Sequence, residues 1–197
     1  FHMPERLYGR EGDVQRLMEA FERTRSGKAE LMLLAGQSGI GKSALVHEVH
    51  KPITRARGYF IGGKFDQFQR NTPYLGMVAA LRALVRQLLT ESDSRLAKWR
   101  QELNDALAPN AQVILDVLPE LELVIGPQAA VPELGAAEAI NRFNRVIVQL
   151  LHVLSAENRV IVIFLDDLQW ADTATLNLLR VILTDESIER LLVIGAY

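Results

Sequence analysis

The distribution of apolar residues along the chain predicts strands that alternate with helices. Four short segments have the length and composition of strands, and the last two are too apolar to leave one face in water. Such strands are typical of a parallel sheet covered by helices on both sides, so the order of elements predicts a doubly wound parallel sheet. The four segments are residues 30–35, 58–64, 159–165 and 190–197.

Apolar residues at helical spacing mark the helices between these strands. Ser26 and Gly27 end the first helix, Pro52 stops the helix after the first strand, and Ser92 or Ser94 caps a later one. Four prolines, at positions 109, 119, 127 and 132, predict turns and short helices in the middle of the chain. The predicted apolar faces are Val14, Leu17, Met18 and Phe21; Met77, Leu81, Leu84 and Leu88; Leu96, Trp99, Leu103 and Leu107; Ile140, Phe143, Ile147, Leu150 and Leu154; and Leu176, Leu179 and Leu183.

The stretch between the second and third strands is far longer than a simple crossover, which needs a dozen or more residues. We therefore expect a helical insertion at about residues 66–135 within a single domain that spans residues 1–197. The chain stops on the last residue of an apolar strand, where a covering element should follow. This ending predicts a fragment of a longer polypeptide.

Residues 36–43 read Gly-Gln-Ser-Gly-Ile-Gly-Lys-Ser and match the phosphate-binding P-loop, G-x-x-x-x-G-K-[S/T]. A predicted strand precedes the motif and a predicted helix follows it, which is the required context. The loop amides and the helix N-terminus would bind phosphate, Lys42 would reach the β- and γ-phosphates, and Ser43 would bind Mg²⁺. The alternative is a glycine-rich turn without a ligand. The predicted phosphate-binding residues are Gly36, Gln37, Ser38, Gly39, Ile40, Gly41, Lys42, Ser43 and Ala44.

A second motif follows the third strand, which ends in Asp166-Asp167. Two carboxylates at the end of a buried strand are costly unless a cation neutralises them, and a nucleotide with Mg²⁺ supplies one. This is the Walker B pattern, in which Asp166 would hold Mg²⁺ and Asp167 would polarise the attacking water. Asp167 as a helix N-cap or turn residue is the alternative.

Composition narrows the classes of function. The 197 residues are 49% hydrophobic and carry a net charge of −2, so the chain can bury a core and has no basic surface for nucleic acid. There are no cysteines, which excludes disulfides and thiolate metal sites and is compatible with the cytoplasm. No apolar stretch has the length of a membrane span, and the N-terminus lacks a signal-peptide core.

Three segments together carry a family resemblance: residues 7–11 (Leu-Tyr-Gly-Arg-Glu), the P-loop, and residues 165–172 (Leu-Asp-Asp-Leu-Gln-Trp-Ala-Asp). They resemble the signal-transduction ATPases with numerous domains, in the AAA+-like branch of P-loop ATPases. Residues 58–70, 119–126 and 194–197 resemble the ATPase module of large bacterial sensor kinases. The resemblance implies a three-layer α/β/α P-loop NTPase fold whose fourth strand lies between the first and third, in the order 2-3-4-1.

The resemblance also implies further site residues. Tyr8, Gly9 and Arg10 would border the adenine, whereas the residues alone equally allow Arg10 and Glu11 to cap the first helix. In the family, an arginine after the fourth strand senses the γ-phosphate and a lid closes over the nucleotide; both would fall beyond Tyr197, which predicts weak binding and slow turnover for this piece.

The sequence therefore predicts an ATP-binding, ATP-hydrolysing regulatory domain that uses Mg²⁺. Its expected partners are other domains of its polypeptide and, through nucleotide-dependent self-association, further copies of itself. A nucleotide-gated scaffold without hydrolysis is the main alternative. A small-molecule kinase would need an arginine-rich lid, which is not seen, and a DNA-handling ATPase disagrees with the mild acidity. Lys64, Asp66 and Gln67 form either a loop tied by local hydrogen bonds or a contact with a neighbouring subunit or domain.

Overall fold

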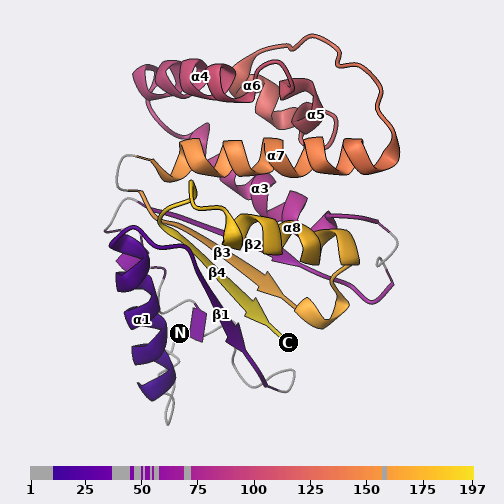
Figure 1. Cartoon of the computed structure of the whole chain (residues 1–197). Helices are drawn as coiled ribbons and strands as arrows, with labels where there is room; N and C mark the ends of the chain where they lie inside the picture. Colours follow the sequence, from indigo (N-terminus) through magenta and orange to yellow (C-terminus); the bar gives the residue numbers. More distant parts are fainter. Residues whose placement is uncertain are drawn as a thin grey trace, which may run out of the picture.

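A computed structural model of the chain places a parallel sheet between two layers of helices (Figure 1). The structure describes residues 11–36, 45, 46, 50, 52, 53, 55, 58–68, 72–156 and 159–197. Within that part, no helix combines the length and the apolar character that crossing a membrane requires.

The sheet has four parallel strands in the order β1-β4-β3-β2. This confirms the predicted order, in which the fourth strand of the chain separates the first from the third. Because all four strands run in the same direction, their carboxyl ends lie at one edge of the sheet. The strands are β1 (Glu30–Leu34), β2 (Tyr59–Lys64), β3 (Ile161–Asp166) and β4 (Leu191–Ala196).

Alternate residues of the central strands face two separate cores. Val162 and Ile194 face the smaller core, beneath α1 (Glu11–Arg25) and the helical residues after the P-loop segment. Ile163 and Val193 face the larger core, beneath α3 (Leu75–Leu88), α7 (Ala136–Ser155) and α8 (Thr173–Thr184). Both faces of β3 and β4 are therefore buried, as their uninterrupted apolar sequences predict.

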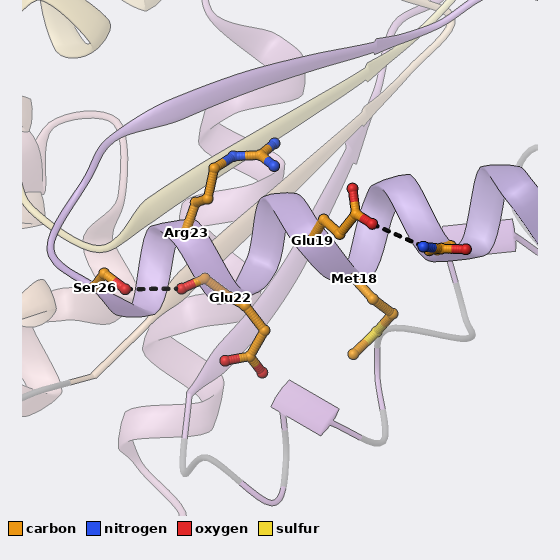
Figure 2. Close-up of a pocket in the computed structure, with 6 residues that line it drawn as sticks. Met18, Glu19, Glu22, Arg23 and Ser26 are labelled. Atoms are coloured by element: carbon orange, nitrogen blue, oxygen red, sulfur yellow. Dashed lines mark hydrogen bonds between the residues drawn. The ribbon is translucent and has the colours of Figure 1, made fainter.

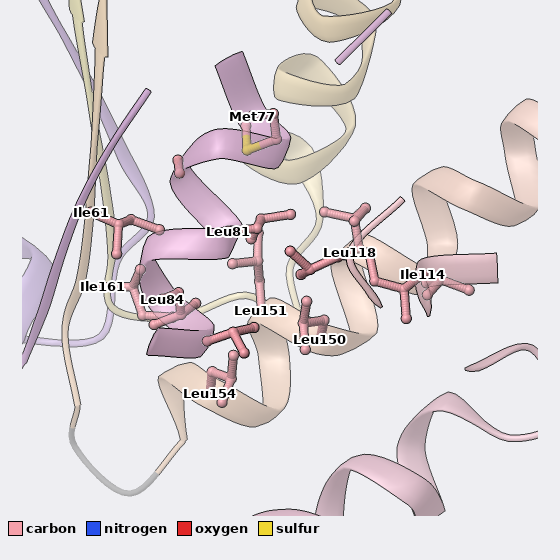
Figure 3. Packing of buried hydrophobic residues seen from close by; sticks show 14 of the residues in the cluster. Ile61, Met77, Leu81, Leu84, Ile114, Leu118, Leu150, Leu151, Leu154 and Ile161 are labelled. Atoms are coloured by element: carbon pink, nitrogen blue, oxygen red, sulfur yellow. The ribbon is translucent and has the colours of Figure 1, made fainter. Parts of the chain in front are cut away.

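The helices between α3 and α7 build an additional layer on the outer side of α7 (Figure 1). Figure 3 shows Leu81 and Leu84 of α3 lying between Ile61 of the sheet and Leu151 of α7. The prolines divide the middle of the chain as predicted. The outer elements are α4 (Asp93–Leu107), α5 (Ala111–Leu115), the 3₁₀ helix η1 (Pro119–Leu121) and α6 (Glu122–Ile125).

Three details of the predicted helices are wrong. Pro52 does not stop helical structure, because Pro52, Ile53 and Arg55 are all helical. Ile140 is 43% exposed although it was assigned to the apolar face of α7, and Leu176 is 48% exposed although it was assigned to that of α8. In α8 the buried face is shifted by one position toward the N-terminus, and Thr175, which bonds to the cap residue Asp172, is buried in place of Leu176. Its buried residues are Thr175, Leu178, Leu179 and Ile182.

Two glycines bring α3 into direct backbone contact with β2. A Cβ atom on Gly63 would lie 1.9 Å from the carbonyl oxygen of Gly76, so no larger residue fits at position 63. A Cβ atom on Gly76 would in turn lie 2.5 Å from the ring of Phe65, which is buried. The first turn of α3 is therefore held directly on the carboxyl end of β2.

A charged and aromatic cluster connects α3 and α4 to the opposite, amino end of the sheet. Arg159 donates to Glu91 Oε1 over 3.0 Å and to the hydroxyl of Tyr59, which itself donates to Glu91. The Arg159 guanidinium also lies 5.2 Å from the ring centre of Trp99. Burial alone would raise the pKa of Glu91, but the hydrogen bonds from Tyr59 and Arg159 outweigh it and lower this pKa below its usual value.

Replacement of Gly63 by alanine is expected to lower the free energy of unfolding by about 3 kcal/mol, because the new methyl group overlaps backbone that cannot move without displacing α3. Urea unfolding measures the change. Gly62→Ala is the matched control, since its Cβ would be 3.7 Å from the nearest atom, and we expect it to change stability by less than about 1 kcal/mol. Equal losses in the two variants would contradict the close contact.

Glu91→Gln is expected to lower the free energy of unfolding at pH 7 by about 1–2 kcal/mol, through loss of charged hydrogen bonds. The pKa of Glu91 is lower in the folded state, so its stabilisation is complete above the unfolded pKa of about 4.3 and is lost as pH falls through the folded value. The difference between wild type and variant should therefore narrow toward pH 3 in unfolding curves. The control is Glu22→Gln, because Glu22 is exposed. If the stability difference between wild type and Glu91→Gln did not change with pH, the lowered pKa of Glu91 would be ruled out as its cause.

Candidate functional site

The carboxyl ends of β1, β3 and β4 bring the two sequence motifs to one edge of the sheet. The chain leaves β1 through Gly36, the first residue of the P-loop motif, and the Gly36 amide donates to the carbonyl of Tyr197 over 3.1 Å. The Tyr197 amide donates to the carbonyl of Leu34, also over 3.1 Å. On the other side of β4, β3 ends at Asp166. The two motifs therefore flank the end of β4.

Of the residues predicted to form the site, the structure describes Gly36, Asp166 and Asp167. Tyr8, Gly9, Arg10 and residues 37–44, which include Lys42 and Ser43, lie outside the described residues. The geometry of the phosphate-binding loop thus stays a prediction from its motif, while its starting point and the acidic side of the site are located.

Asp166 is held in the sheet by its backbone and retains a carboxylate oxygen for a ligand. In the parallel register of β3 and β2, Asp166 lies opposite Lys64, and the Asp166 carbonyl accepts a hydrogen bond from the Phe65 amide over 3.1 Å. Its Oδ1 accepts from the Asp167 amide over 3.0 Å. Its Oδ2 accepts no hydrogen bond from any described residue.

Asp167 has an unusual backbone conformation that turns the chain away from the sheet. Its φ of 54° and ψ of 42° lie in the left-handed region, which aspartate tolerates better than most residues. It precedes the 3₁₀ helix η2 (Leu168–Trp170), but its side chain makes no capping hydrogen bond. Its Oδ1 instead accepts from Gln169 Nε2 over 3.1 Å, and its Oδ2 lies 3.4 Å from Lys64 Nζ. Asp167 is therefore a turn residue whose carboxylate is directed to other groups.

The segment that follows β2 is tied by local contacts. Asp66 Oδ1 accepts from the Phe68 amide over 2.9 Å, and Lys64 forms its ion pair within this domain. These contacts agree with a locally bonded loop. A contact of Lys64, Asp66 and Gln67 with another subunit or domain stays a prediction.

Asp172 is the last residue of the segment 165–172 that carries the family resemblance, and the sequence predicts no role for it. It is the N-cap of α8, where its Oδ1 accepts from the Thr175 amide over 2.8 Å and its Oδ2 from the Thr175 hydroxyl over 2.6 Å. Asp172 Oδ2 also accepts from the amide of Tyr74, 98 positions away in the sequence, over 3.2 Å. An aspartate just before a helical pattern is a recognisable N-cap signal, whereas the contact with Tyr74 has none.

The chemistry of the donors fits a hard divalent cation. Mg²⁺ usually takes one or two carboxylates and completes its shell with water and phosphate oxygens. Asp166 supplies a carboxylate oxygen that accepts no hydrogen bond from the described residues, at the edge where the P-loop motif begins. Among the described residues no three His, Cys, Asp or Glu side chains gather closely enough to form a metal site by themselves. A Mg²⁺ ion at this edge would therefore depend on the phosphates as well.

Described residues of α1 line a hollow on each of two sides of the helix, and these two hollows differ in their distance from the edge that carries the motifs. The larger, about 600 Å³, lies on the outer face of α1 between Met18 and Ser26 (Figure 2). Its lining residue Arg23 bonds to Glu30 at the amino end of β1, far from the strand ends of the site. The second, about 300 Å³, lies at the carboxyl end of β1 between Asp13 and Arg16 of α1, Ala35 and Leu45. Two of its lining residues, Ala35 and Leu45, come directly before and directly after the predicted phosphate loop in the sequence.

Comparison with protein families agrees with this geometry. A family model described as the AAA ATPase domain matches residues 6–194, which is nearly the whole chain. The chain belongs to the AAA ATPase domain family. The parallel sheet flanked by helices is consistent with this family.

This AAA ATPase domain is also similar to segments of two much longer proteins. It is 34% identical over 178 residues to hybrid signal transduction histidine kinase G of Dictyostelium discoideum, in an alignment that covers 90% of this chain and 5% of that protein. It is 21% identical over 199 residues to histidine protein kinase 1 of Candida albicans, which covers 94% of this chain and 8% of that protein. The chain spans less than a tenth of either relative.

Proposed function

We propose that this domain binds ATP with Mg²⁺, hydrolyses it and regulates other parts of a signalling polypeptide. The observation that carries the proposal is the meeting of the P-loop start at Gly36 and the acidic pair Asp166-Asp167 at one sheet edge, on either side of the end of β4. Phosphoryl transfer to water mainly requires positioning and neutralisation of charge, and both are available at such an edge.

The nucleotide would lie along the edge with its phosphates on the P-loop. The amides of residues 37–44 would bind the phosphate oxygens, and Lys42 would neutralise the β- and γ-phosphates. The 300 Å³ hollow beside α1 supports a place for the base, because α1 starts at Glu11, directly after Tyr8, Gly9 and Arg10. These three residues would then border the adenine.

Asp166 and Asp167 would have different roles, one in holding the metal ion and the other in orienting water. Ser43 and Asp166 would hold Mg²⁺, which would supply positive charge to balance that of the phosphates. Asp167 would orient the attacking water with the carboxylate that now faces Lys64. The side chains of Lys64 and Asp167 are 70% and 29% exposed, so their ion pair contributes only about 0–1 kcal/mol and Asp167 can exchange it for water and substrate.

The similarity to two signal-transduction histidine kinases supports a regulatory output. The γ-phosphate would favour one arrangement of the strand-end loops and hydrolysis would release it, and other domains of the polypeptide or a second copy would sense the change. The narrower class of signal-transduction ATPases with numerous domains is part of this proposal. A nucleotide-gated scaffold without hydrolysis is the rival, since Asp167 is also engaged as a turn residue.

Lys42→Ala is expected to weaken ATP binding well over tenfold, because the triphosphate loses the cation of the P-loop. Isothermal titration calorimetry in the presence of Mg²⁺ measures the change. Lys98→Ala is the matched control, because Lys98 lies on α4 and pairs with Glu102. Unchanged affinity in Lys42→Ala would reject the phosphate site.

Asp167→Asn is expected to retain Mg²⁺-ATP binding and to slow hydrolysis by about 10²-fold or more, as for loss of a positioned general base. Asp166→Asn should instead weaken the Mg²⁺ dependence of binding. Single-turnover assays with protein in excess over ATP measure both the binding and the rate of hydrolysis, and they still detect slow hydrolysis. Equal hydrolysis by wild type and Asp167→Asn would favour the scaffold.

A further inference from the structure

We infer that Asp172 is a positioning residue that fixes the β3–α8 turn, residues 166–172, against the start of α3 and thereby sets the place of Asp167. The inference rests on the proposed function, because it assigns Asp172 a part in the same reaction. It does not require Asp172 to touch nucleotide or metal, and it depends only on contacts within the described residues.

The first part of the argument is the double use of one carboxylate. Asp172 Oδ1 is engaged by the Thr175 amide at 2.8 Å, which caps α8. Asp172 Oδ2 accepts both the Thr175 hydroxyl at 2.6 Å and the Tyr74 amide at 3.2 Å. Thr175 is completely buried, so these hydrogen bonds are shielded from water. A cap alone needs one acceptor oxygen, and the second oxygen is used to reach α3.

The second part is the strained residue that Asp172 holds. Tyr74 is the N-cap residue of α3, its φ is 63°, and it makes no side-chain capping bond. A left-handed conformation is unfavourable for tyrosine and persists only when its surroundings fix it. The Tyr74 ring packs on Phe143 of α7 with ring centres 4.5 Å apart. The hydrogen bond from the Tyr74 amide to Asp172 and this ring contact therefore hold the start of α3 from two sides.

The third part is that these contacts close a ring around Asp167. From Asp172 the chain runs back through η2, whose hydrogen bonds from Trp170 to Asp167 and from Ala171 to Leu168 make a stiff spacer. On the other side, Tyr74 begins α3, and α3 contacts β2 at Gly63, which is the neighbour of Lys64. The ion pair of Lys64 with Asp167 completes the ring. Loosening Asp172 would therefore free both the turn that carries Asp167 and the start of α3, and the weak contact with Lys64 would not hold Asp167 in place by itself.

Asp172→Asn tests this role, because asparagine replaces one of the two carboxylate oxygens with an NH2 donor. The Thr175 amide and the Tyr74 amide bond to different oxygens of Asp172, so both cannot keep an acceptor in the variant. We expect ATP affinity within about twofold of wild type and a turnover number lower by about tenfold or more, since a small displacement of a catalytic group is costly. Hydrogen exchange of the protein without nucleotide should accelerate in both residues 72–76 and residues 166–170.

Asp185→Asn is the matched control, because Asp185 sits at the other end of α8 and accepts from the Ser187 amide and hydroxyl in a surface turn. It should leave turnover and the exchange of both segments unchanged. Faster exchange confined to residues 173–176 in Asp172→Asn, or unchanged turnover with both segments released, would overturn the inference. If the wild type hydrolyses no ATP, the proposed function fails separately, and the exchange data alone decide whether Asp172 joins the two segments.

Discussion

Burial of both faces of the two central strands is the constraint on which this structure depends. The alternate residues of β3 and β4 lie in two different cores, one under α1 and the other under α3, α7 and α8. Strands of this kind cannot face water, so polar chemistry is possible only where they end. Because the strands are parallel, these ends share one edge, and that edge carries Gly36, Asp166 and Asp167.

Charge at this edge is balanced by contacts that leave room for a ligand. Asp166 uses one carboxylate oxygen on its own turn, and Asp167 faces a largely exposed lysine rather than a buried partner. Among the described residues neither aspartate forms a strong ion pair, so little free energy is needed to turn them from these contacts toward Mg²⁺ or water. The stiff parts lie just behind them: the glycine contact between β2 and α3, and the hydrogen bonds of Asp172.

Much of the fold could be predicted from local pattern. The four strands, the helices and the short pieces between the prolines follow from apolar periodicity, and the place of β4 between β1 and β3 was implied by the family resemblance. The errors concern which residues of a helix face the core. Ile140 and Leu176 fit the helical period but lie outside the surface that neighbouring elements cover. Periodicity gives the angle of a face, and packing decides how wide the buried part is.

For the site, the sequence by itself determined the chemical groups and their order: the phosphate loop from Gly36 and the acidic pair at the end of a buried strand. Only the tertiary structure decided their partners. Lys64 meets Asp167 because β2 pairs with β3, and Asp172 meets Tyr74 because α3 packs directly on β2. A motif records groups that are near in the chain. Contacts between residues about 100 positions apart arise from the pairing of strands and the packing of helices, which depend on the whole molecule.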